Sequence, residues 1–354
     1  MPTINSQWLT DALKTTGVLK DARVVEIERI DFDHIPSYLS RIARFKLVYD
    51  KECDAPKSIV VKVQPDQEPF KSVEQLYLAF EREVYFYDKV APKLPNSFEL
   101  ARCYFACYNT KSHPGILVLE DMSHLEAGDQ IQGLTYRQIE SATRRIASLH
   151  ATFWDERLAE LSWLCERNYM MIDRYSEFFG LFKEKYQNRI DQESLLIGEL
   201  IAQSLQKLLA LAASRPQSLV HCDLRADNLR FGKGDELVIF DWQLITKALP
   251  GFDLGRLLGE NCDLTMDEQI SLVEVWHQTL SFFAKDYIKG YSKDDALFDY
   301  KLGLALATHV PVINAAMLKD ANPRTQKLVD LMAFRFFKCA KAMKLGDFVR
   351  STQS

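Results

Sequence analysis

The sequence predicts a mixed α and β fold, with a strand-rich N-terminal part and a mainly helical C-terminal part. Residues 24–63 and 101–120 contain short runs that are alternating or continuously apolar, as in strands. From Met122 onward, apolar residues recur at helical spacing. In addition, the apolar run Leu237–Phe240 ends on Asp241, which is typical of a buried strand that delivers an acid to a loop.

The composition is that of an ordinary globular protein, with 354 residues of which 47% are hydrophobic and 26% charged. The chain is long enough for two substantial cores. A net charge of −5 argues against nucleic acid or an anionic membrane surface as the main partner. The seven cysteines are odd in number and widely spread, so they favour reduced thiols in a cytoplasm over a disulfide framework.

The sequence shows no targeting or membrane-spanning signal. The N-terminal stretch MPTINSQWLTDALK lacks a basic region followed by an apolar core, so we expect no secretory signal. The best candidate for a spanning segment, residues 304–318, is interrupted by His309, Pro311 and Asn314 and is shorter than the roughly 18 residues that a spanning helix requires. These features predict a soluble cytoplasmic protein without membrane insertion.

The elements follow in order along the chain. Ser6 is expected to cap a first helix that ends at Gly17. Five strands are expected, at residues 24–30, 41–49, 58–63, 101–108 and 115–120. One helix, residues 74–91, comes between the third and the fourth strand. Further helices are expected at residues 135–154, 198–214, 265–284 and 294–344, the last with a break at Asn322-Pro323.

A cluster of polar residues lies between positions 219 and 242. His221, Asp223 and Asn228 have H-x-D-x-x-x-x-N spacing, and Asp241 follows eighteen residues after Asp223. Asn228 and Asp241 offer the hard oxygen ligands that Mg²⁺ prefers. Asp223 would orient an acceptor hydroxyl and take its proton late, because a carboxylate with a reference pKa of about 3.9 is too weak to ionise an alcohol in advance. Phosphoryl transfer divides its tasks in this way.

The stretch HCDLRADNLRF followed by IFDWQ resembles the catalytic loop of protein-kinase-like phosphotransferases. It is most similar to the aminoglycoside phosphotransferase and choline kinase group, and within it to the ecdysteroid-kinase-like, or CHK-like, branch. The resemblance implies a bilobal α+β fold of the protein-kinase type. A small lobe of antiparallel sheet and one helix, residues 1–122, would bind the nucleotide, and a larger helical lobe, residues 123–354, would carry catalysis and the acceptor. ATP and Mg²⁺ are the implied cofactors.

The resemblance also assigns a nucleotide-binding pair. Lys62 lies in an otherwise apolar strand, where a buried ammonium group is costly unless it is paired, although it also fits a solvent-facing lysine. In kinase-like families this lysine holds phosphates and pairs with a helix glutamate. The stretch FEREVYFYDKVAPKLP resembles the CHK-like pattern, which favours Glu83 over Glu81 as that partner.

The strand GILVLEDM resembles the one that leads into the hinge between the lobes. By this analogy, backbone groups of Glu120 to Met122 would bind the adenine edge. The chain departs from the kinase pattern in one respect, since it has no glycine between Gly17 and Gly115 to form a phosphate-binding loop. Only the hydroxyls of Ser37 and Ser40 remain there, and Ser40 is the predicted nucleotide contact.

Several neighbours are expected to support the site. His221 would brace the catalytic loop, with proton transfer as the alternative, and Asp253 matches a family aspartate that ties this loop in place through backbone hydrogen bonds. Cys222 lies where a glycine is frequent in the small-molecule kinases, as a small buried residue or a reactive thiol. Asp227 competes with Asp223 as the base but directly precedes the ligand Asn228. His150 is expected to make a structural hydrogen bond.

The leading hypothesis is therefore an ATP-dependent phosphotransferase that acts on a hydroxyl group of a small molecule. A protein kinase is less favoured, because only eleven residues separate Asp241 from Asp253 and no A-P-E sequence follows. The missing glycine loop motivates a third hypothesis, a catalytically silent nucleotide-binding or scaffold protein. Amino sugars, choline-like amines, sterols and other alcohols all fit as acceptors. The aromatic segment 163–186 either lines an acceptor pocket or forms core. The motifs specify no oligomeric state.

Overall fold

The structure is a computed structural model that describes residues 4–30, 40–65, 78–109, 113–164, 169, 171–318 and 321–353. The chain forms two compact units. The first comprises Met1–Leu94, Glu99–Glu126 and Val238–Leu244, and the second comprises Pro95–Phe98, Ala127–Leu237 and Ile245–Ser354. Ser37 and the start of the helix expected at residues 74–91 lie outside the described residues.

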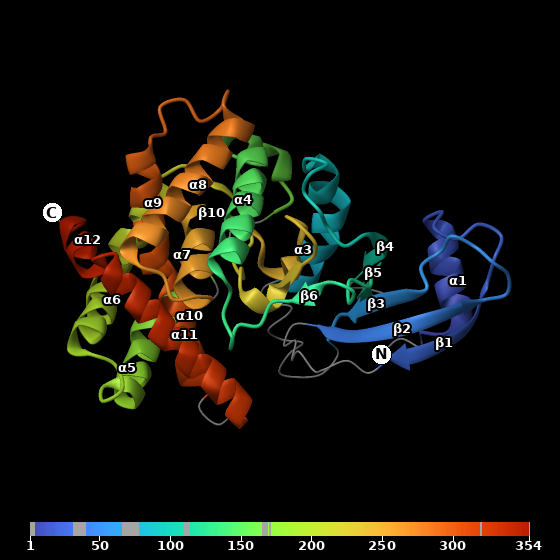
Figure 1. The fold of residues 1–354 in the computed structure, drawn as a ribbon, viewed down its shortest axis with the longest axis horizontal. Helices are drawn as coiled ribbons and strands as arrows, with labels where there is room; N and C mark the ends of the chain where they lie inside the picture. The colour runs from blue at the N-terminus through green and yellow to red at the C-terminus, as the bar shows by residue number, and fades with distance from the viewer. Residues whose placement is uncertain are drawn as a thin grey trace. The chain divides into compact units, whose positions relative to one another are not determined.

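A five-stranded antiparallel sheet dominates the first unit, in the order β1-β2-β3-β5-β4 (Figure 1). Its strands are β1 (Val24–Ile30), β2 (Arg41–Tyr49), β3 (Ser58–Val63), β4 (Cys103–Asn109) and β5 (His113–Glu120). The alternation in β2 places Ala43, Phe45 and Leu47 in the core. The predicted bounds of the first three strands are confirmed.

Helix α1 (Ser6–Thr15) packs Leu9 and Leu13 against this core. The expectation that Ser6 caps the helix is wrong, because the side chain of Asn5 accepts the backbone N–H of Trp8 at 2.8 Å. Asparagine is as good an N-cap as serine, and here it precedes the serine by one residue. The helix ends before Gly17, whose φ of +72° suits glycine.

The second helix of this unit changes its geometry along its length. It is α-helical as α3 (Ala79–Tyr85), π-helical over Phe86–Val90 and 3₁₀-helical over Ala91–Lys93. Phe80 and Val84 pack against β5, as their helical spacing predicts. The π-helical part places the ring of Phe86 on that of Trp242, with centroids 3.9 Å apart and planes 7° apart. This stacking fastens the segment 238–244 to the first unit.

The second unit is mainly helical, which confirms the predicted α+β architecture. Its helices are α4 (Tyr136–Thr152), α5 (Tyr175–Tyr186), α6 (Gln192–Ala213), α7 (Gly251–Glu260), α8 (Met266–Ala284), α9 (Lys293–Ala307), α10 (His309–Met317), α11 (Pro323–Ala342) and α12 (Leu345–Ser351). The short strands β7 (Ser218–Val220) and β10 (Thr246–Ala248) pair antiparallel. Strand β8 (Leu229–Phe231) precedes a turn that contains Gly232 and Gly234, and strand β9 (Leu237–Ile239) follows this turn.

Local signals explain the helix bounds. Thr135 and Thr265 cap α4 and α8, each in a capping box with the residue three positions on. Helix α6 begins earlier than expected because Asp191 accepts the backbone N–H of Ser194 at 3.0 Å. The predicted helix at 294–344 is divided, with Asn322 capping α11.

Two helices are long and apolar enough to cross a membrane when only length and composition are considered. They are Gln192–Ala213 and Lys293–Met317, and 44% and 78% of their apolar windows are buried inside the protein. Core helices of a folded domain meet the same criteria, so this finding is weak evidence for a membrane span.

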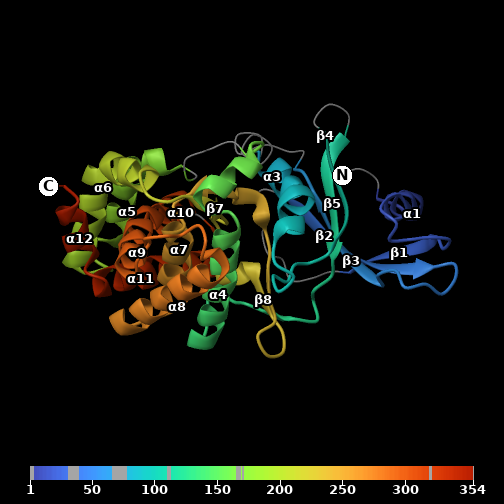
Figure 2. The same cartoon turned by 90° about the horizontal axis from the view of Figure 1, so that it is seen from above.

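Helices α7 and α9 approach each other so closely that only glycine fits at their contact (Figure 2). A Cβ on Gly303 would lie 2.0 Å from the backbone of Gly251, and a Cβ on Gly251 would lie 2.0 Å from the carbonyl oxygen of Asp299. Backbone atoms cannot move aside as a flexible side chain can. This contact therefore fixes the position of α7, the helix that carries Asp253.

Replacing Gly303 by alanine should lower the free energy of unfolding by about 1–3 kcal/mol, because the helices must separate. Gly180 is the matched control, since it lies inside α5 and a Cβ there meets nothing within 4 Å. Gly180→Ala should raise stability by about 0.5–1 kcal/mol through helix propensity. Chemical denaturation of both variants measures the difference, and equal effects would contradict the close packing of α7 and α9.

Candidate active site

The first unit contains a buried cluster of one cation and two carboxylates. The Nζ atom of Lys62 on β3 lies 2.6 Å from Oε2 of Glu83 on α3 and 2.9 Å from Oδ1 of Asp241. The side chains of Lys62 and Glu83 are 6% and 1% exposed, whereas that of Asp241 is 28% exposed. The structure thus brings together three predicted site residues, two of them far apart in the sequence from Asp241.

The electrostatics of this cluster follow from its unequal charges. Burial opposes the charge on Lys62, but the nearby carboxylates outweigh it and raise the pKa of the ammonium group. Burial also raises the pKa of Glu83, and the negative charge of Asp241 adds to this effect although Lys62 opposes it. Two carboxylates share one ammonium group, so the cluster carries an excess of negative charge that a further cation would relieve.

The partners of Glu83 and Asp241 hold the cluster in place. Gln243 donates from Nε2 to Oε2 of Glu83 at 3.1 Å, so both oxygens of this buried carboxylate are paired. Asp241 has a φ of +66°, in the left-handed region that residues with a Cβ rarely adopt. The stacking of the next residue, Trp242, on Phe86 over-determines this conformation. Glu81, the alternative to Glu83, lies two residues away on α3.

The other predicted nucleotide-binding residues lie at or just beyond the ends of inner strands of the sheet. Ser40 is 5% exposed and directly precedes β2. Glu120 ends β5, and its backbone N–H donates to the carbonyl oxygen of Arg102 at 2.8 Å. The carbonyl oxygen of Met122 accepts the N–H of Leu125 at 3.0 Å. These two backbone groups are already paired, and contact of this segment with adenine stays a prediction.

In the second unit, Asp253 anchors the start of the loop 221–228, which is the predicted catalytic loop. Its two carboxylate oxygens accept the backbone N–H groups of His221 at 2.7 Å and of Cys222 at 2.8 Å. His150 Nε2 lies 3.2 Å from the same carboxylate, and its Nδ1 accepts the indole N–H of Trp276 at 3.0 Å. Asp253 and His150 are both fully buried. The loop is therefore tied to α4, α7 and α8 by paired buried groups.

The carboxylate of Asp223 is held by three donors. Arg256 donates to Oδ1 at 2.7 Å, whereas Arg225 and Asn228 donate to Oδ2 at 3.2 and 3.0 Å. Burial opposes ionisation of Asp223, but the two guanidinium groups outweigh it and lower its pKa. A carboxylate accepts about four hydrogen bonds, so capacity for one more donor remains. His221 contributes Nδ1, which accepts the backbone N–H of Asp223 at 3.1 Å.

The chemistry of Asn228 fits a ligand for a hard cation. Its Nδ2 donates to the backbone oxygen of Asp223 at 2.9 Å and to the carboxylate of the same residue. Because both partners only accept, the amide nitrogen must face Asp223 and the amide oxygen is left for another group. Among the described residues, no group of three or more His, Cys, Asp or Glu side chains has the arrangement of a metal site. A site of few protein ligands completed by phosphates is what Mg²⁺ prefers.

Sequence analysis missed three charged residues around Asp223. Arg225 lies inside the catalytic motif and also pairs with Asp227, at 2.8 Å. Arg256 and Glu260 pair with each other at 2.6 Å and are almost fully buried on α7. For Arg256 and Glu260, the available signal was a spacing of four residues on a helix, which is also the spacing of ordinary surface ion pairs.

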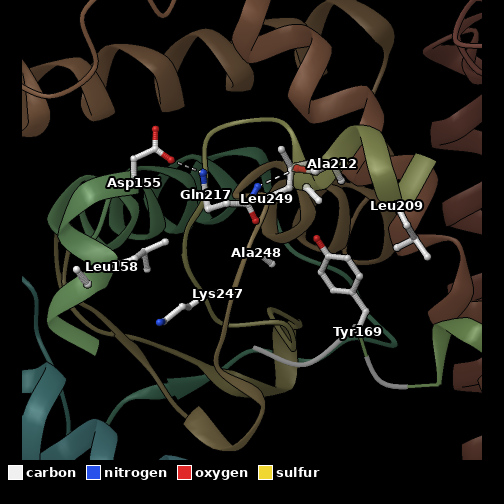
Figure 3. Close-up of a pocket in the computed structure, with 11 residues that line it drawn as sticks. Asp155, Leu158, Tyr169, Leu209, Ala212, Gln217, Lys247, Ala248 and Leu249 are labelled. Carbon is white, nitrogen blue, oxygen red and sulfur yellow. Dashed lines mark hydrogen bonds between the residues drawn. The ribbon is translucent and has the colours of Figure 1, made fainter. Parts of the chain in front are cut away.

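A cavity of about 690 Å³ lies in the second unit (Figure 3). Tyr169 contributes one wall, and its ring stacks on that of Phe252 with centroids 4.1 Å apart. Most of the other lining residues are aliphatic, and Lys247 is the one cation among the lining residues. The carboxylate of Asp155 accepts the backbone N–H of Gln217 at 2.8 Å. Tyr169 belongs to the aromatic segment that was expected to line a pocket or form core.

Comparison with known structures shows the same fold in small-molecule kinases. A protein of Ralstonia eutropha that is provisionally named an aminoglycoside phosphotransferase shares 16% identity, with 95% of this chain and 98% of that chain covered and a TM-score of 0.57. Choline kinase from Cryptosporidium parvum shares 13% identity, with coverages of 90% and 89% and a TM-score of 0.54. The GDP complex of a mutant aminoglycoside 2′-phosphotransferase shares 11% identity, with coverages of 98% and 98% and a TM-score of 0.51.

No curated protein matches the sequence significantly. The model of the ecdysteroid kinase-like family, by contrast, matches residues 35–287, which include Lys62, Asp223 and Asp241. This match spans well over half of the chain, and it agrees with the resemblance of the catalytic loop. The protein belongs to the ecdysteroid kinase-like family.

Proposed function

We propose that the protein is an ATP- and Mg²⁺-dependent phosphotransferase that phosphorylates a hydroxyl group of a small molecule in the cytoplasm. The observation that carries this proposal is the buried pairing of Lys62 with Glu83 and Asp241. Buried ion pairs rarely add stability, because the cost of removing the charges from water offsets their attraction. Function is the better reason for three charged groups in this place.

On the nucleotide side, Lys62 would exchange Asp241 for phosphate oxygens while Glu83 keeps it aligned. Glu83 is suited to this role because it is 1% exposed and both its oxygens are bonded. Asp241 is the more exposed carboxylate and, with the amide oxygen of Asn228, would hold Mg²⁺. The ion would neutralise charge on the phosphates. Ser40 and the segment 120–122 remain the proposed further contacts.

On the acceptor side, Asp223 would accept a hydrogen bond from the substrate hydroxyl and take its proton late in the transfer. Its lowered pKa keeps it ionised and thus able to accept at neutral pH. Positioning is then its main contribution to the rate. The cavity beside Tyr169 is lined by aliphatic side chains together with Lys247 and Asp155, whose opposite charges favour neither an acidic nor a basic acceptor.

The alternatives make different predictions. A silent scaffold of this fold would not need Lys62, Asp223, Asn228 and Asp241 together, which counts against it. A protein kinase would need an activation segment, and only a 3₁₀ turn at Trp242–Leu244 and the three-residue β10 separate Asp241 from the segment before α7. A screen of ATP consumption against hydroxylated metabolites and against generic peptides separates the three functions.

Asp223→Asn should lower kcat by about 100- to 10,000-fold, because the amide cannot accept the proton. The affinity for nucleotide should stay within about twofold, since Asp223 is not among the proposed nucleotide contacts or metal ligands. Asp235→Asn is the control, because the side chain of Asp235 is 93% exposed and outside the charged network around Asp223, and it should retain most of the turnover. Steady-state kinetics with the acceptor found by the screen measure both variants. Near wild-type turnover in Asp223→Asn would show that the role of Asp223 is wrongly assigned.

Asp241→Asn should weaken binding of ATP in the presence of Mg²⁺ by about tenfold or more, which corresponds to about 1.4 kcal/mol. Without Mg²⁺ the variant and the wild type should differ much less, because the lost carboxylate acts through the ion. Isothermal titration calorimetry with a non-hydrolysable ATP analogue measures both conditions. Failure of the wild type to bind nucleotide in either condition would favour the scaffold.

Cys222→Gly should raise the free energy of unfolding by about 1 kcal/mol. Cys222 has a φ of +66°, a conformation that costs a residue with a Cβ about 1–2 kcal/mol and costs glycine little. Cys222→Ala keeps the Cβ and should bring no such gain, so the pair separates backbone strain from loss of the thiol. Equal stabilities of the two variants in chemical denaturation would rule out the strain.

A further inference from the structure

We propose that Arg256 and Glu260, one turn apart on α7, are positioning residues that hold the carboxylate of Asp223 in the orientation that the acceptor requires. The inference deepens the proposed function and rests on it, because it concerns the same carboxylate. Neither residue is expected to touch the substrate, and both would act through Asp223.

The contacts form a continuous chain of charged groups. One terminal nitrogen of Arg256 donates to Oδ1 of Asp223 at 2.7 Å, and the other donates to Oε1 of Glu260 at 2.6 Å. Arg256 is 2% exposed, and its Nε has no hydrogen-bond partner among the described residues. The unpaired N–H costs free energy, but the same placement of the planar guanidinium group directs both of its terminal nitrogens at carboxylates.

Glu260 is in turn held from behind. It is fully buried, and its second oxygen accepts Nε2 of Gln130 at 3.3 Å. The backbone of Gln130 is fixed on both sides, because its N–H donates to Asp227 at 3.1 Å and its carbonyl oxygen accepts from Arg335. Asn261 follows Glu260 in the chain, and its side-chain oxygen accepts the backbone N–H of Ala226 in the predicted catalytic loop at 2.7 Å. The C-terminal end of α7 is thus bonded directly to the catalytic loop.

Burial is the main influence on the charge of Glu260. The groups that face this network are Arg225, Arg256, Asp223, Asp227 and, through Gln130, Arg335. Three guanidinium groups face two aspartates, so it is the removal of the fully buried Glu260 from water, and not a surplus of negative charge, that opposes its ionisation. Burial raises the pKa of Glu260 to about 7, an effect that Arg256 opposes and Asp223 reinforces. Glu260 therefore changes its charge near neutral pH.

Gln130 is suited to serve both protonation states. Its Oε1 is buried and has no hydrogen-bond partner among the described residues. Rotation of the amide exchanges its oxygen and nitrogen. Ionised Glu260 accepts from Nε2, whereas protonated Glu260 donates its O–H to Oε1. The amide of Gln130 can therefore form a hydrogen bond with the carboxyl group of Glu260 whether that group is protonated or ionised.

The strength with which Arg256 binds the carboxylate of Asp223 therefore depends on pH. Below pH 7 the guanidinium of Arg256 has one charged partner, Asp223. Above pH 7 it is shared with the ionised Glu260, and its attraction for Asp223 weakens. Because catalysis depends on the position of this carboxylate, kcat should fall as the pH rises through about 7.

The first test compares the pH profile of kcat in the wild type and in Glu260→Gln, which keeps size and hydrogen bonding but cannot ionise. The ratio of wild-type to variant kcat should fall by about threefold to tenfold between pH 6 and pH 8. Titration of the nucleotide and the acceptor cancels in this ratio. Glu184→Gln, an exposed residue of α5, is the control and should give a constant ratio. A constant ratio for Glu260→Gln would overturn the proposal.

The second test asks whether Arg256 acts on the reaction and not only on folding. Arg256→Lys should lower kcat by about tenfold to a hundredfold with nucleotide affinity unchanged, and Arg256→Met should lower it further, because lysine keeps the charge. Arg137→Lys is the exposed control. If lysine and methionine gave equal losses, or if nucleotide affinity fell in parallel with kcat, the positioning role would be wrong.

A third measurement separates this proposal from the proposed function. A carboxyl group with a raised pKa in the folded state stabilises the fold less as the pH rises from its ordinary value of 4.5 to about 7. The wild-type Tm should therefore fall by several degrees across this range relative to the Tm of Glu260→Gln. If this difference appears without any turnover, the phosphotransferase function is refuted and the charged network stands. If the difference is absent, the network is refuted whatever the turnover.

Discussion

The buried ammonium group of Lys62 is the interaction on which the first unit depends. It is placed by a strand flanked on both sides, and it is neutralised by a glutamate from the adjacent helix and by an aspartate from a segment 179 residues away. Without both carboxylates the burial of this charge would be very costly. The stacking of Trp242 on Phe86 and the bond from Gln243 to Glu83 serve the same arrangement. The first unit thus keeps the ammonium group of Lys62 buried and paired with two carboxylates.

The second unit likewise holds a charged side chain inside the protein, and here the charge is negative. Here a carboxylate, Asp223, must stay ionised inside the protein, and two arginines and an asparagine supply the donors. The loop that bears it is held by Asp253 through backbone hydrogen bonds, and α7 carries Asp253, Arg256 and Glu260 on neighbouring turns. The glycine contact between α7 and α9 fixes that helix. Close packing at the start of α7 thus helps to place the charged groups that this helix carries.

Much of this was predictable from local patterns. The alternation of β2, the lone Lys62 in an apolar strand and the acid that ends the run 237–240 are short-range signals, and the structure contains each element. The cap of α1 was misjudged because Asn5 and Ser6 are both good caps and only the backbone conformation decides between them. Arg256 and Glu260 were missed for a different reason. Burial depends on packing by distant segments, so sequence cannot distinguish a buried pair from the common surface pair at the same spacing. Likewise, the left-handed backbone of Cys222 has no signature in a cysteine.

Under the proposed function, Lys62, Asn228 and Asp241 would act on the same nucleotide and ion. A crystal structure of the protein with a non-hydrolysable ATP analogue and Mg²⁺ tests it most directly. The predicted result has Nζ of Lys62 bonded to phosphate oxygens and Mg²⁺ bound by the amide oxygen of Asn228 and the carboxylate of Asp241. Nucleotide bound away from Lys62, or an ion that binds neither Asn228 nor Asp241, would contradict the account.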